Sequence, residues 1–286
     1  MNTLKMDHFV ASSISEILDN GVNSLGARPK YASDGKTANS KYITDVFIKF
    51  YLDKGELPIS RLRPVYTGLA RQELFWIYQD QTSDLQPLRD RGVHWWEDWA
   101  LEDGTIGQRY GATVNRYNLI DRLIEGLEKN PYNRRNIINL WQYKDLDETE
   151  GLMPCAFQTI WDVREVNGEM FLDMSLIQRS SDFLIAGMGI NQIQYVALQM
   201  MVAKHFGWKV GTFSWHVMNL HIYDRYFAQA QELVARFENM NQEEQKEIEF
   251  YLDVPDKTNF YDIKPSDFVL KGYSSVGDQM KFDMAI

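Results

Sequence analysis

The chain has little of what secreted or membrane proteins are built from. Its 286 residues include one cysteine, so no internal disulfide can form, and a disulfide-stapled secreted fold is excluded. No uninterrupted apolar run approaches the roughly 20 residues that a membrane-spanning helix needs. Residues 1–12 show no basic region followed by an apolar stretch and a small-residue cleavage site, so we see no secretion signal. We therefore expect a cytoplasmic protein without a membrane partner.

Basic side chains are outnumbered. There are 30 Lys and Arg against 40 Asp and Glu, which gives a net charge of −10. This balance argues against a broad nucleic-acid-binding face, so we do not expect a nucleic-acid partner. If the ligand is an anion, arginines must gather locally against the overall field. The sequence shows no internal repeat, low-complexity linker or charge block, so we expect one domain over residues 1–286.

Hydrophobic periodicity and turn signals predict alternating helices and strands. Helices are expected at 7–20, 66–79, 118–129 and 191–206, with a further helix ending near 237, and strands at 42–51, 137–141, 157–166, 170–177 and 213–217. Asn167-Gly168 between the third and fourth of these strands is a strong hairpin signal. Residues 238–286 are charged and are expected to be rich in loops.

The single cysteine, Cys155, directly follows Pro154 in the stretch MPCAFQTIW. A free cysteine is most often inert core filler. A second polar group, Gln178-Arg179-Ser180-Ser181-Asp182, stands at the end of an apolar run about two dozen residues later. A guanidinium beside a thiol lowers its pKa and makes it a nucleophile near neutral pH. The residues alone leave both a packed thiol and a nucleophile open.

Three further features have a structural and a functional interpretation. Glu73 is a lone carboxylate among aromatic residues, where it is either solvated or tuned by burial. The tryptophans of HWWEDWA, residues 94–100, form either core and interface or a stacking wall for a planar ligand. The pair Arg134-Arg135 is either a solvated surface feature or a bidentate phosphate grip.

In their order and spacing, these motifs resemble the thymidylate synthase family over nearly the whole chain. The matching positions are Arg28, Glu73 in QELFWIY, Trp96, Trp99, Tyr110-Gly111, Asn133-Arg134-Arg135, Pro154-Cys155, Gln178 to Asp182, Gly189-Ile190-Asn191, His221-Ile222-Tyr223 and Met284-Ala285-Ile286. The resemblance implies an α+β fold with one large twisted mixed sheet flanked by helices. It also implies a homodimer in which two such sheets pack against each other.

The reaction that this resemblance implies is the reductive methylation of dUMP to dTMP. The co-substrate would be 5,10-methylenetetrahydrofolate, and no metal would be needed. Cys155 would add to C6 of the uracil ring, so that C5 attacks the folate methylene. Glu73 would run the proton relay, and Tyr110 would assist removal of the C5 proton. Hydride transfer from the folate would then give dTMP and dihydrofolate.

The resemblance also implies which residues bind the two substrates. The dUMP site would consist of Arg28, Gln178, Arg179, Ser180, Asn191, His221 and Tyr223, with Arg134 and Arg135 reaching the phosphate in the neighbouring subunit's site. Asn191 would present its amide to the uracil O4 and N3–H edge, and Arg179 would also favour the thiolate. The folate site would consist of Arg63, Trp96, Trp99, Asp182, Gly187 and the C-terminal Ile286.

Four departures from the family pattern are visible in the sequence. Ala156 follows the cysteine where histidine is common, and one extra residue separates Asp182 from Asn191. A glycine-rich turn with an aspartate is replaced by residues 216–219, His-Val-Met-Asn. Arg63 stands where the family often has lysine, so the cation is kept but its shape differs.

Two other functions therefore stay open. A dUMP hydroxymethylase shares the fold and the first half of the mechanism, but water captures the methylene intermediate instead of hydride. Cytosine-specific members of that group resemble this chain at residues 216–219. They carry aspartate where this chain has Asn191, so Asn191 favours uracil as the base. The third possibility is a non-catalytic nucleotide-binding or regulatory protein on the same scaffold. The retained cysteine, glutamate and arginines count against it.

Overall fold

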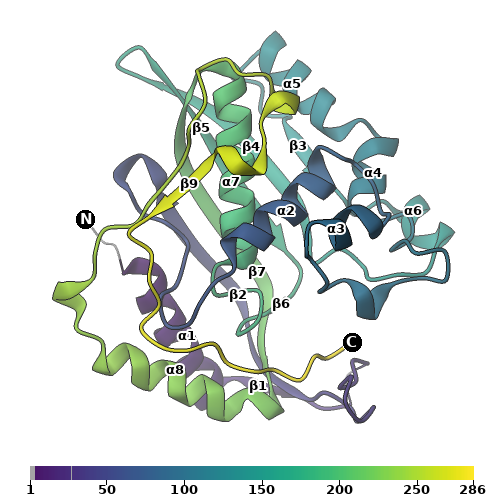
Figure 1. The fold of residues 1–286 in the computed structure, drawn as a ribbon, viewed down its shortest axis with the longest axis vertical. Helices are drawn as coiled ribbons and strands as arrows, with labels where there is room; N and C mark the ends of the chain where they lie inside the picture. Colours follow the sequence, from purple (N-terminus) through teal and green to yellow (C-terminus); the bar gives the residue numbers. More distant parts are fainter. Residues whose placement is uncertain (1–3, 27) are drawn as a thin grey trace.

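A large mixed β-sheet organises the fold (Figure 1). The computed structural model describes residues 4–26 and 28–286, and within them the sheet has seven strands in the order β1-β2-β7-β5-β4-β3, with β6 paired to β7. The strands are β1 (Val22–Ser24), β2 (Ser40–Tyr51), β3 (Ile137–Asn139), β4 (Ala156–Val166), β5 (Glu169–Gln178), β6 (Ser181–Asp182) and β7 (Lys209–Tyr223). β5 and β6 run parallel to β7, and the other pairs are antiparallel. The predicted α+β class with one large mixed sheet flanked by helices is confirmed.

Helices cover one face of this sheet (Figure 1). They are α1 (Lys5–Asn20), α2 (Thr67–Tyr78), α3 (Gln86–Asp90), α4 (Gly111–Arg116), α5 (Leu119–Lys129), α6 (Tyr143–Glu148), α7 (Ile190–Phe206) and α8 (Phe227–Asn239). Short 3₁₀ turns lie at Leu52–Lys54, Glu97–Trp99, Asp224–Tyr226, Gln242–Glu244, Phe260–Asp262 and Pro265–Asp267. β8 (Glu249–Leu252) and β9 (Phe268–Lys271) form a separate small antiparallel sheet, and β8 contacts α7.

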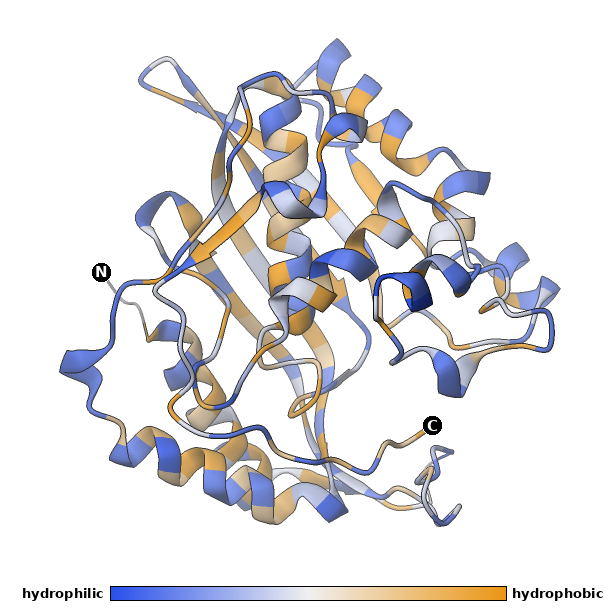
Figure 2. Ribbon diagram, in the orientation of Figure 1, coloured by the Kyte–Doolittle hydropathy of each residue, from blue (hydrophilic) through white to orange (hydrophobic). Residues whose placement is uncertain are grey.

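The centre of the core is α7, which crosses the middle of the sheet in Figure 1. Its residues from Gln192 to Ala203 are all buried, as expected for a helix that is apolar around most of its circumference. Figure 2 shows hydrophobic colours over much of this helix, whereas the strands beneath it carry a mixture of hydrophobic and hydrophilic colours. The helix ends at Gly207, whose φ of 72° is a left-handed conformation that glycine adopts without a steric penalty.

The two faces of the sheet differ in burial, because side chains alternate along each strand. One row across the sheet, Ile48, Trp215, Leu176, Thr159 and Ile138, is buried under the helices. The neighbouring residue of each strand, in the row Lys49, Ser214, Ser175, Ile160 and Ile137, points to the opposite face. That face exposes large apolar side chains, including Phe47 at 59% and Met218 at 55% of their surface.

The predicted helices and strands are confirmed apart from their ends. The hairpin turn is confirmed too, since Asn167 and Gly168 have φ values of 52° and 80°. Several predicted boundaries were wrong by one or two residues, and those of one strand by more. Strand β3 ends at Asn139, two residues before Trp141, and the strand expected at 213–217 extends over Lys209–Tyr223. β7 is hydrogen-bonded on both sides, by β2 and by β5 with β6, so sheet pairing extends it beyond its local pattern.

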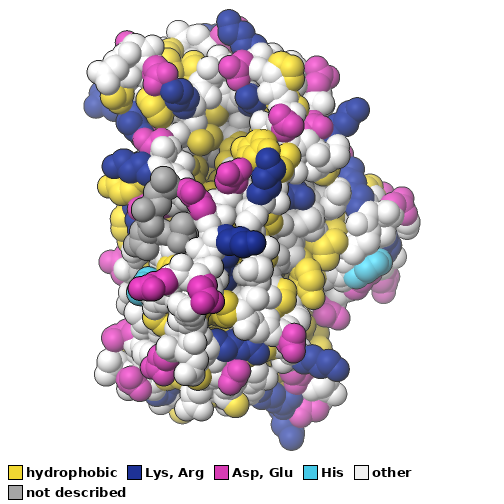
Figure 3. Space-filling view, turned by 60° about the vertical axis from the view of Figure 1, so that its left-hand side comes forward, with side chains coloured by type: hydrophobic (Ala, Val, Ile, Leu, Met, Phe, Trp, Pro, Cys, Tyr) yellow, Lys and Arg dark blue, Asp and Glu magenta, His cyan; other side chains and the backbone are white. Residues whose placement is uncertain are grey.

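Acidic and basic side chains intermingle on the face shown in Figure 3. The charge of −10 is therefore not gathered into a single acidic patch on that face. Across residues 4–26 and 28–286, each helix is too short or too polar to cross a membrane.

Truncating the core helix tests this description. Leu198 of α7 is fully buried, so Leu198→Ala should lower the free energy of unfolding by about 2–5 kcal/mol through lost burial and a cavity. The same substitution at Leu25, which is 78% exposed, should change it by less than about 0.5 kcal/mol. Chemical denaturation of both variants measures the difference, and equal losses would contradict the assignment of α7 to the core.

Candidate active site

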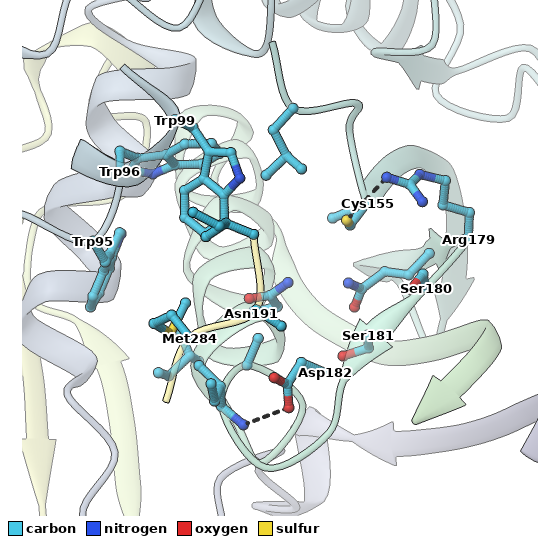
Figure 4. A pocket seen from close by; sticks show the side chains of 18 of the residues that line it. Trp95, Trp96, Trp99, Cys155, Arg179, Ser180, Ser181, Asp182, Asn191 and Met284 are labelled. Atoms are coloured by element: carbon cyan, nitrogen blue, oxygen red, sulfur yellow. Dashed lines mark hydrogen bonds between the residues drawn. The ribbon is translucent and has the colours of Figure 1, made fainter. Parts of the chain in front are cut away.

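A cavity of about 350 Å³ opens over the middle of the sheet (Figure 4). It brings together most of the residues singled out from the sequence, namely Arg28, Glu73, Trp96, Trp99, Tyr110, Cys155, Gln178, Arg179, Ser180, Asp182, Asn191, His221, Tyr223 and Ile286. In Figure 4 the tryptophans lie on one side and Cys155 with Arg179 on the other, with Asn191 between them. Segments far apart in the sequence thus surround one space.

Cys155 directly precedes β4, where the chain enters the sheet. Its backbone N–H donates to the Tyr110 hydroxyl at 3.2 Å. The Arg179 guanidinium donates to the carbonyls of Met153 and Pro154, and its Nη2 lies 3.5 Å from Cys155 Sγ. The predicted neighbourhood of thiol and guanidinium is present, so Cys155 faces a cavity and is not core filler.

The state of this thiol differs from the expectation. Burial raises the pKa of the Cys155 thiol above its ordinary value, and the opposing effect of the Arg179 charge is smaller. Loss of hydration disfavours the thiolate more than the single guanidinium of Arg179 favours it, and that guanidinium also donates to two backbone carbonyls. In this structure the cysteine is therefore mainly a thiol near neutral pH.

Glu73 extends from α2 into the aromatic side of the cavity. The Trp96 indole N–H donates to its Oε1 at 2.7 Å, and the Gln194 amide donates to its Oε2 at 2.6 Å. Burial raises the pKa of the Glu73 carboxyl to about 7, and these hydrogen bonds act in the opposite direction. Of the two interpretations of Glu73, the buried and tuned carboxyl is the one that the structure shows.

Tyr110 connects the aromatic side to the cysteine. Its ring packs edge-on against Trp96, with centroids 5.1 Å apart, and Trp96 packs in turn against Trp99. The φ and ψ of Tyr110 are 46° and −108°, a sparsely populated positive-φ conformation that costs a non-glycine residue about 1–3 kcal/mol. Burial raises the pKa of its hydroxyl well above the ordinary value, so the group is protonated.

The polar side of the cavity comes from adjacent strands. β6 pairs with the end of β7, which places Asp182 opposite His221. Burial raises the pKa of Asp182 to about 7 and lowers that of His221 to about 4, so the imidazole is neutral. His221 Nδ1 lies 3.0 Å from Asn219 Oδ1, and its ring packs edge-on against Tyr223. Both ring nitrogens are thus held in a defined orientation.

The C-terminal segment lies along the mouth of the cavity. Lys30 and Ile286 exchange two backbone hydrogen bonds of 2.8 Å, and Ala32 donates to the Met284 carbonyl. Arg225 binds both Asp34 and Asp283, which ties the loop after Tyr31 to this segment. Ile286 is therefore held at the cavity by backbone pairing and by a shared arginine.

Four predicted site residues do not line the cavity. Arg134 and Arg135 are exposed in the loop before β3. Arg63 is buried behind the cavity, where it donates to the carbonyls of Leu184 and Ile185. Gly187 packs on Phe183, and its N–H donates to the Asp182 carbonyl. Neither Arg63 nor Gly187 borders the aromatic side of the cavity, and both brace the turn that follows Asp182.

No group of three or more His, Cys, Asp or Glu side chains able to hold a metal ion occurs in the described part of the chain.

Comparisons with known proteins agree with this geometry. The thymidylate synthase family matches residues 10–286. The chain is 59% identical over 282 residues to a thymidylate synthase of Lactococcus lactis, covering 98% of this chain and 99% of that one. It is 54% identical over 284 residues to one from Streptococcus agalactiae, with 99% of both chains covered. A solved structure, thermostable thymidylate synthase A from Bacillus subtilis, superposes with a TM-score of 0.86 at 31% identity, covering 98% and 99% of the two chains.

The chain belongs to the thymidylate synthase family. Thymidylate synthases are methyltransferases, so the predicted family and class of enzyme are confirmed. The motifs had singled out Cys155, Arg179 and Glu73 as the centre of the site. All three line one cavity in this member of the thymidylate synthase family.

The sequence analysis missed two cavity residues on α7. Gln194 and Tyr195 line the cavity beside Asn191. The signal was available for Gln194, because it lies three residues after Asn191 and residues three apart share a helix face. Tyr195 donates to the Ala156 carbonyl at 3.3 Å and accepts from the Tyr78 hydroxyl at 3.1 Å. A tyrosine pair thus lies against the position where the family commonly has histidine.

The titration of the thiol can be measured directly, since Cys155 is the only cysteine. Alkylation by iodoacetamide requires the thiolate, so its rate should rise with a midpoint above the ordinary cysteine pKa of about 8.5. Arg179→Met removes the stabilising charge and should move the midpoint higher, whereas Arg179→Lys should move it less. A wild-type midpoint well below 8.5, measured by mass spectrometry of the labelled protein, would contradict burial as the dominant effect.

Proposed function

We propose that this chain catalyses the reductive methylation of dUMP to dTMP, with 5,10-methylenetetrahydrofolate as co-substrate and Cys155 as the nucleophile. The observation that carries this proposal is the placement of Cys155 Sγ 3.5 Å from the Arg179 guanidinium, in a cavity that also holds a carboxyl and an aromatic wall. Membership in the thymidylate synthase family supports it.

The reaction follows from nucleophilic activation of a ring that is otherwise unreactive. The Cys155 thiol first gives up its proton to solvent. The resulting thiolate forms a bond to C6 of the uracil, and the displaced electron pair makes C5 a nucleophile. C5 attacks the folate methylene, whose bond to one of its two folate nitrogens breaks, and Glu73 moves the protons that this step needs near neutral pH. The bond to the second nitrogen breaks when the folate is eliminated. Tyr110 assists removal of the C5 proton, and the folate is eliminated. Hydride from the folate then reduces the exocyclic methylene, the thiolate leaves C6, and dTMP and dihydrofolate are released.

The polar side of the cavity suits a nucleoside monophosphate. Arg28, Arg179 and Ser180 supply charged and hydroxyl donors for a phosphate dianion. The Nε2 of Gln178 is buried without a partner among the described residues, so an acceptor on a ligand would satisfy it. Asn191 offers both a donor and an acceptor to the uracil edge, and the neutral His221 and Tyr223 would bind the ribose hydroxyl.

The aromatic side of the cavity suits a folate. Trp96 and Trp99 offer faces and edges for a planar heterocycle. Asp182 can accept from ring nitrogens, and the paired Ile286 segment would exclude water from the reacting atoms. Arg63 and Gly187 contribute by holding the 182–187 turn in place. Burial raises the pKa of Asp182, and the positive charge of Arg63 partly opposes this rise.

We also propose that the protein is a homodimer built through the uncovered face of the sheet. Phe47, Ile137, Ile160 and Met218 are exposed large apolar side chains on strands of this sheet, and exposed apolar patches mark interaction surfaces. Arg134 and Arg135 lie exposed next to β3, at the edge of the same sheet. From there they would reach the phosphate in the site of the partner subunit.

Two broader proposals accompany this one. The buried core of the described residues is dominated by one cluster that extends from Met6 to Phe268, which supports a single catalytic domain over residues 1–286. The lone cysteine is free, which suits a reducing compartment, and we propose the cytoplasm.

The product of turnover tests the function. With dUMP and methylenetetrahydrofolate, we expect dihydrofolate absorbance and dTMP mass to rise together, and Cys155→Ser should lower kcat by at least roughly a thousandfold. Met153→Leu, beside the cysteine, is the matched control and should stay active. Formation of 5-hydroxymethyl-dUMP without dihydrofolate would instead show that water captures the intermediate. Binding of dUMP without any turnover would indicate a regulatory protein.

Mixing two inactive variants tests the shared site. Cys155→Ser subunits keep their arginines, and Arg135→Ala subunits keep their cysteine, so each homodimer should be weak or inactive. In a hybrid, the site with Cys155 receives its arginine from the other subunit, and random exchange should restore roughly a quarter of the sites. Titration of active sites after mixing measures this fraction. No recovery despite subunit exchange would show that Arg135 does not act across the interface.

A further inference from the structure

We infer that Gln194 is a positioning residue for the reaction: its side-chain amide fixes the orientation of the Glu73 carboxyl at the wall of the cavity. This inference rests on the proposed function, since it assigns a partner to the carboxyl of the proton relay. Gln194 itself is nearly buried on α7 and lines the same cavity.

The contacts form a clamp across two helices. Gln194 Nε2 donates to Glu73 Oε2 at 2.6 Å and to the Ala70 carbonyl at 3.0 Å, both on α2. The Trp96 indole donates to the other carboxyl oxygen at 2.7 Å. An indole N–H and an amide NH₂ donate but cannot accept at these atoms. The carboxyl is therefore held at both oxygens by donors from two different segments.

The hydrogen bonds from Trp96 and Gln194 favour the carboxylate form of Glu73 over its protonated form. Burial alone disfavours the carboxylate, and hydrogen bonds to its oxygens favour it. The balance leaves the pKa of Glu73 at about 7, where both forms are populated at neutral pH. A proton relay works best when its group exchanges protons near the working pH. Gln194 thus contributes to the orientation of Glu73 and also to its proton affinity.

The placement on α7 links this clamp to the base-reading position. Asn191 lies one helical turn before Gln194 and points into the cavity (Figure 4). Because α7 is a buried, continuous helix, the amide proposed to read the uracil and the amide that holds Glu73 are fixed relative to each other. A shift of either residue along the helix axis would disturb both.

A buried glutamine elsewhere on α7 provides a matched control. Among the described residues, the Gln199 amide donates to two backbone carbonyls, those of Leu172 and Thr212, and it is not part of the cavity lining. Gln194→Met and Gln199→Met remove the same amide from the same helix and keep a side chain of similar length. Only the first removes a donor from Glu73.

The experiment combines infrared difference spectroscopy with steady-state kinetics on the full-length protein. The carboxyl band of Glu73 is assigned by its loss in Glu73→Gln and is then titrated with pH. In Gln194→Met we expect its midpoint at higher pH than in the wild type, with kcat at pH 7 reduced roughly tenfold or more and KM for dUMP changed little. Gln199→Met should keep the wild-type midpoint and kcat. If Gln194→Met fails to fold, Gln194→Asn, whose shorter amide withdraws from Glu73, should shift the midpoint in the same direction.

The outcomes separate the two proposals. A wild-type midpoint and wild-type kcat in a folded Gln194 variant would overturn the positioning role while leaving the synthase activity intact. An equal loss of activity in Gln199→Met would also overturn it, because the effect would then reflect helix stability. Failure of the wild type to form dTMP would refute the proposed function, and the infrared titration would still decide whether Gln194 controls the proton affinity of Glu73.

Discussion

The parallel pairing of β5 with β7 is the constraint on which the site depends. This ladder aligns Gln178 with Val217, and the chain then continues into β6, which pairs with Leu220 and His221. Arg179, which directly follows β5, is thereby brought near His221 of β7, and the antiparallel pairing of β4 with β5 places it beside Cys155. Parallel neighbours need a long crossover, and here α7 supplies it while covering the sheet. One topological choice thus places the polar groups and the core helix together.

Desolvation sets the chemistry of the cavity that this topology creates. The pKa values of Glu73 and Asp182 rise to about 7, that of His221 falls to about 4, and that of Cys155 rises. Each group is pushed toward its neutral form, as expected when charged forms lose water. Hydrogen bonds then oppose this effect to a different extent for each group. Glu73 accepts hydrogen bonds from two donors, Trp96 and Gln194. Glu73 and Asp182 are therefore close to a change of protonation state near neutral pH, which acid–base catalysis requires, whereas His221 and Cys155 are held in their neutral forms.

Much of this arrangement could be predicted from the sequence. The hairpin at Asn167-Gly168 was confirmed because two consecutive left-handed residues specify the turn locally. The ends of β7 were not, since its last residues are held in the strand by partners remote in sequence. The family motifs indicated Cys155, Arg179 and Glu73 as one site. They gave no indication that Arg63 turns away from the cavity to bind the carbonyls of Leu184 and Ile185.

By itself, the sequence determined the family, the order of the elements and the types of reactive group, because these depend on local periodicity and on motif spacing. Only the tertiary structure decided how those groups behave. The thiol of Cys155 is buried enough for desolvation to outweigh Arg179, and Glu73 meets Gln194, which lies 121 residues further along the chain. The proton affinity of a buried group depends on the atoms packed around it. Those neighbours come from distant segments, and packing alone brings them together.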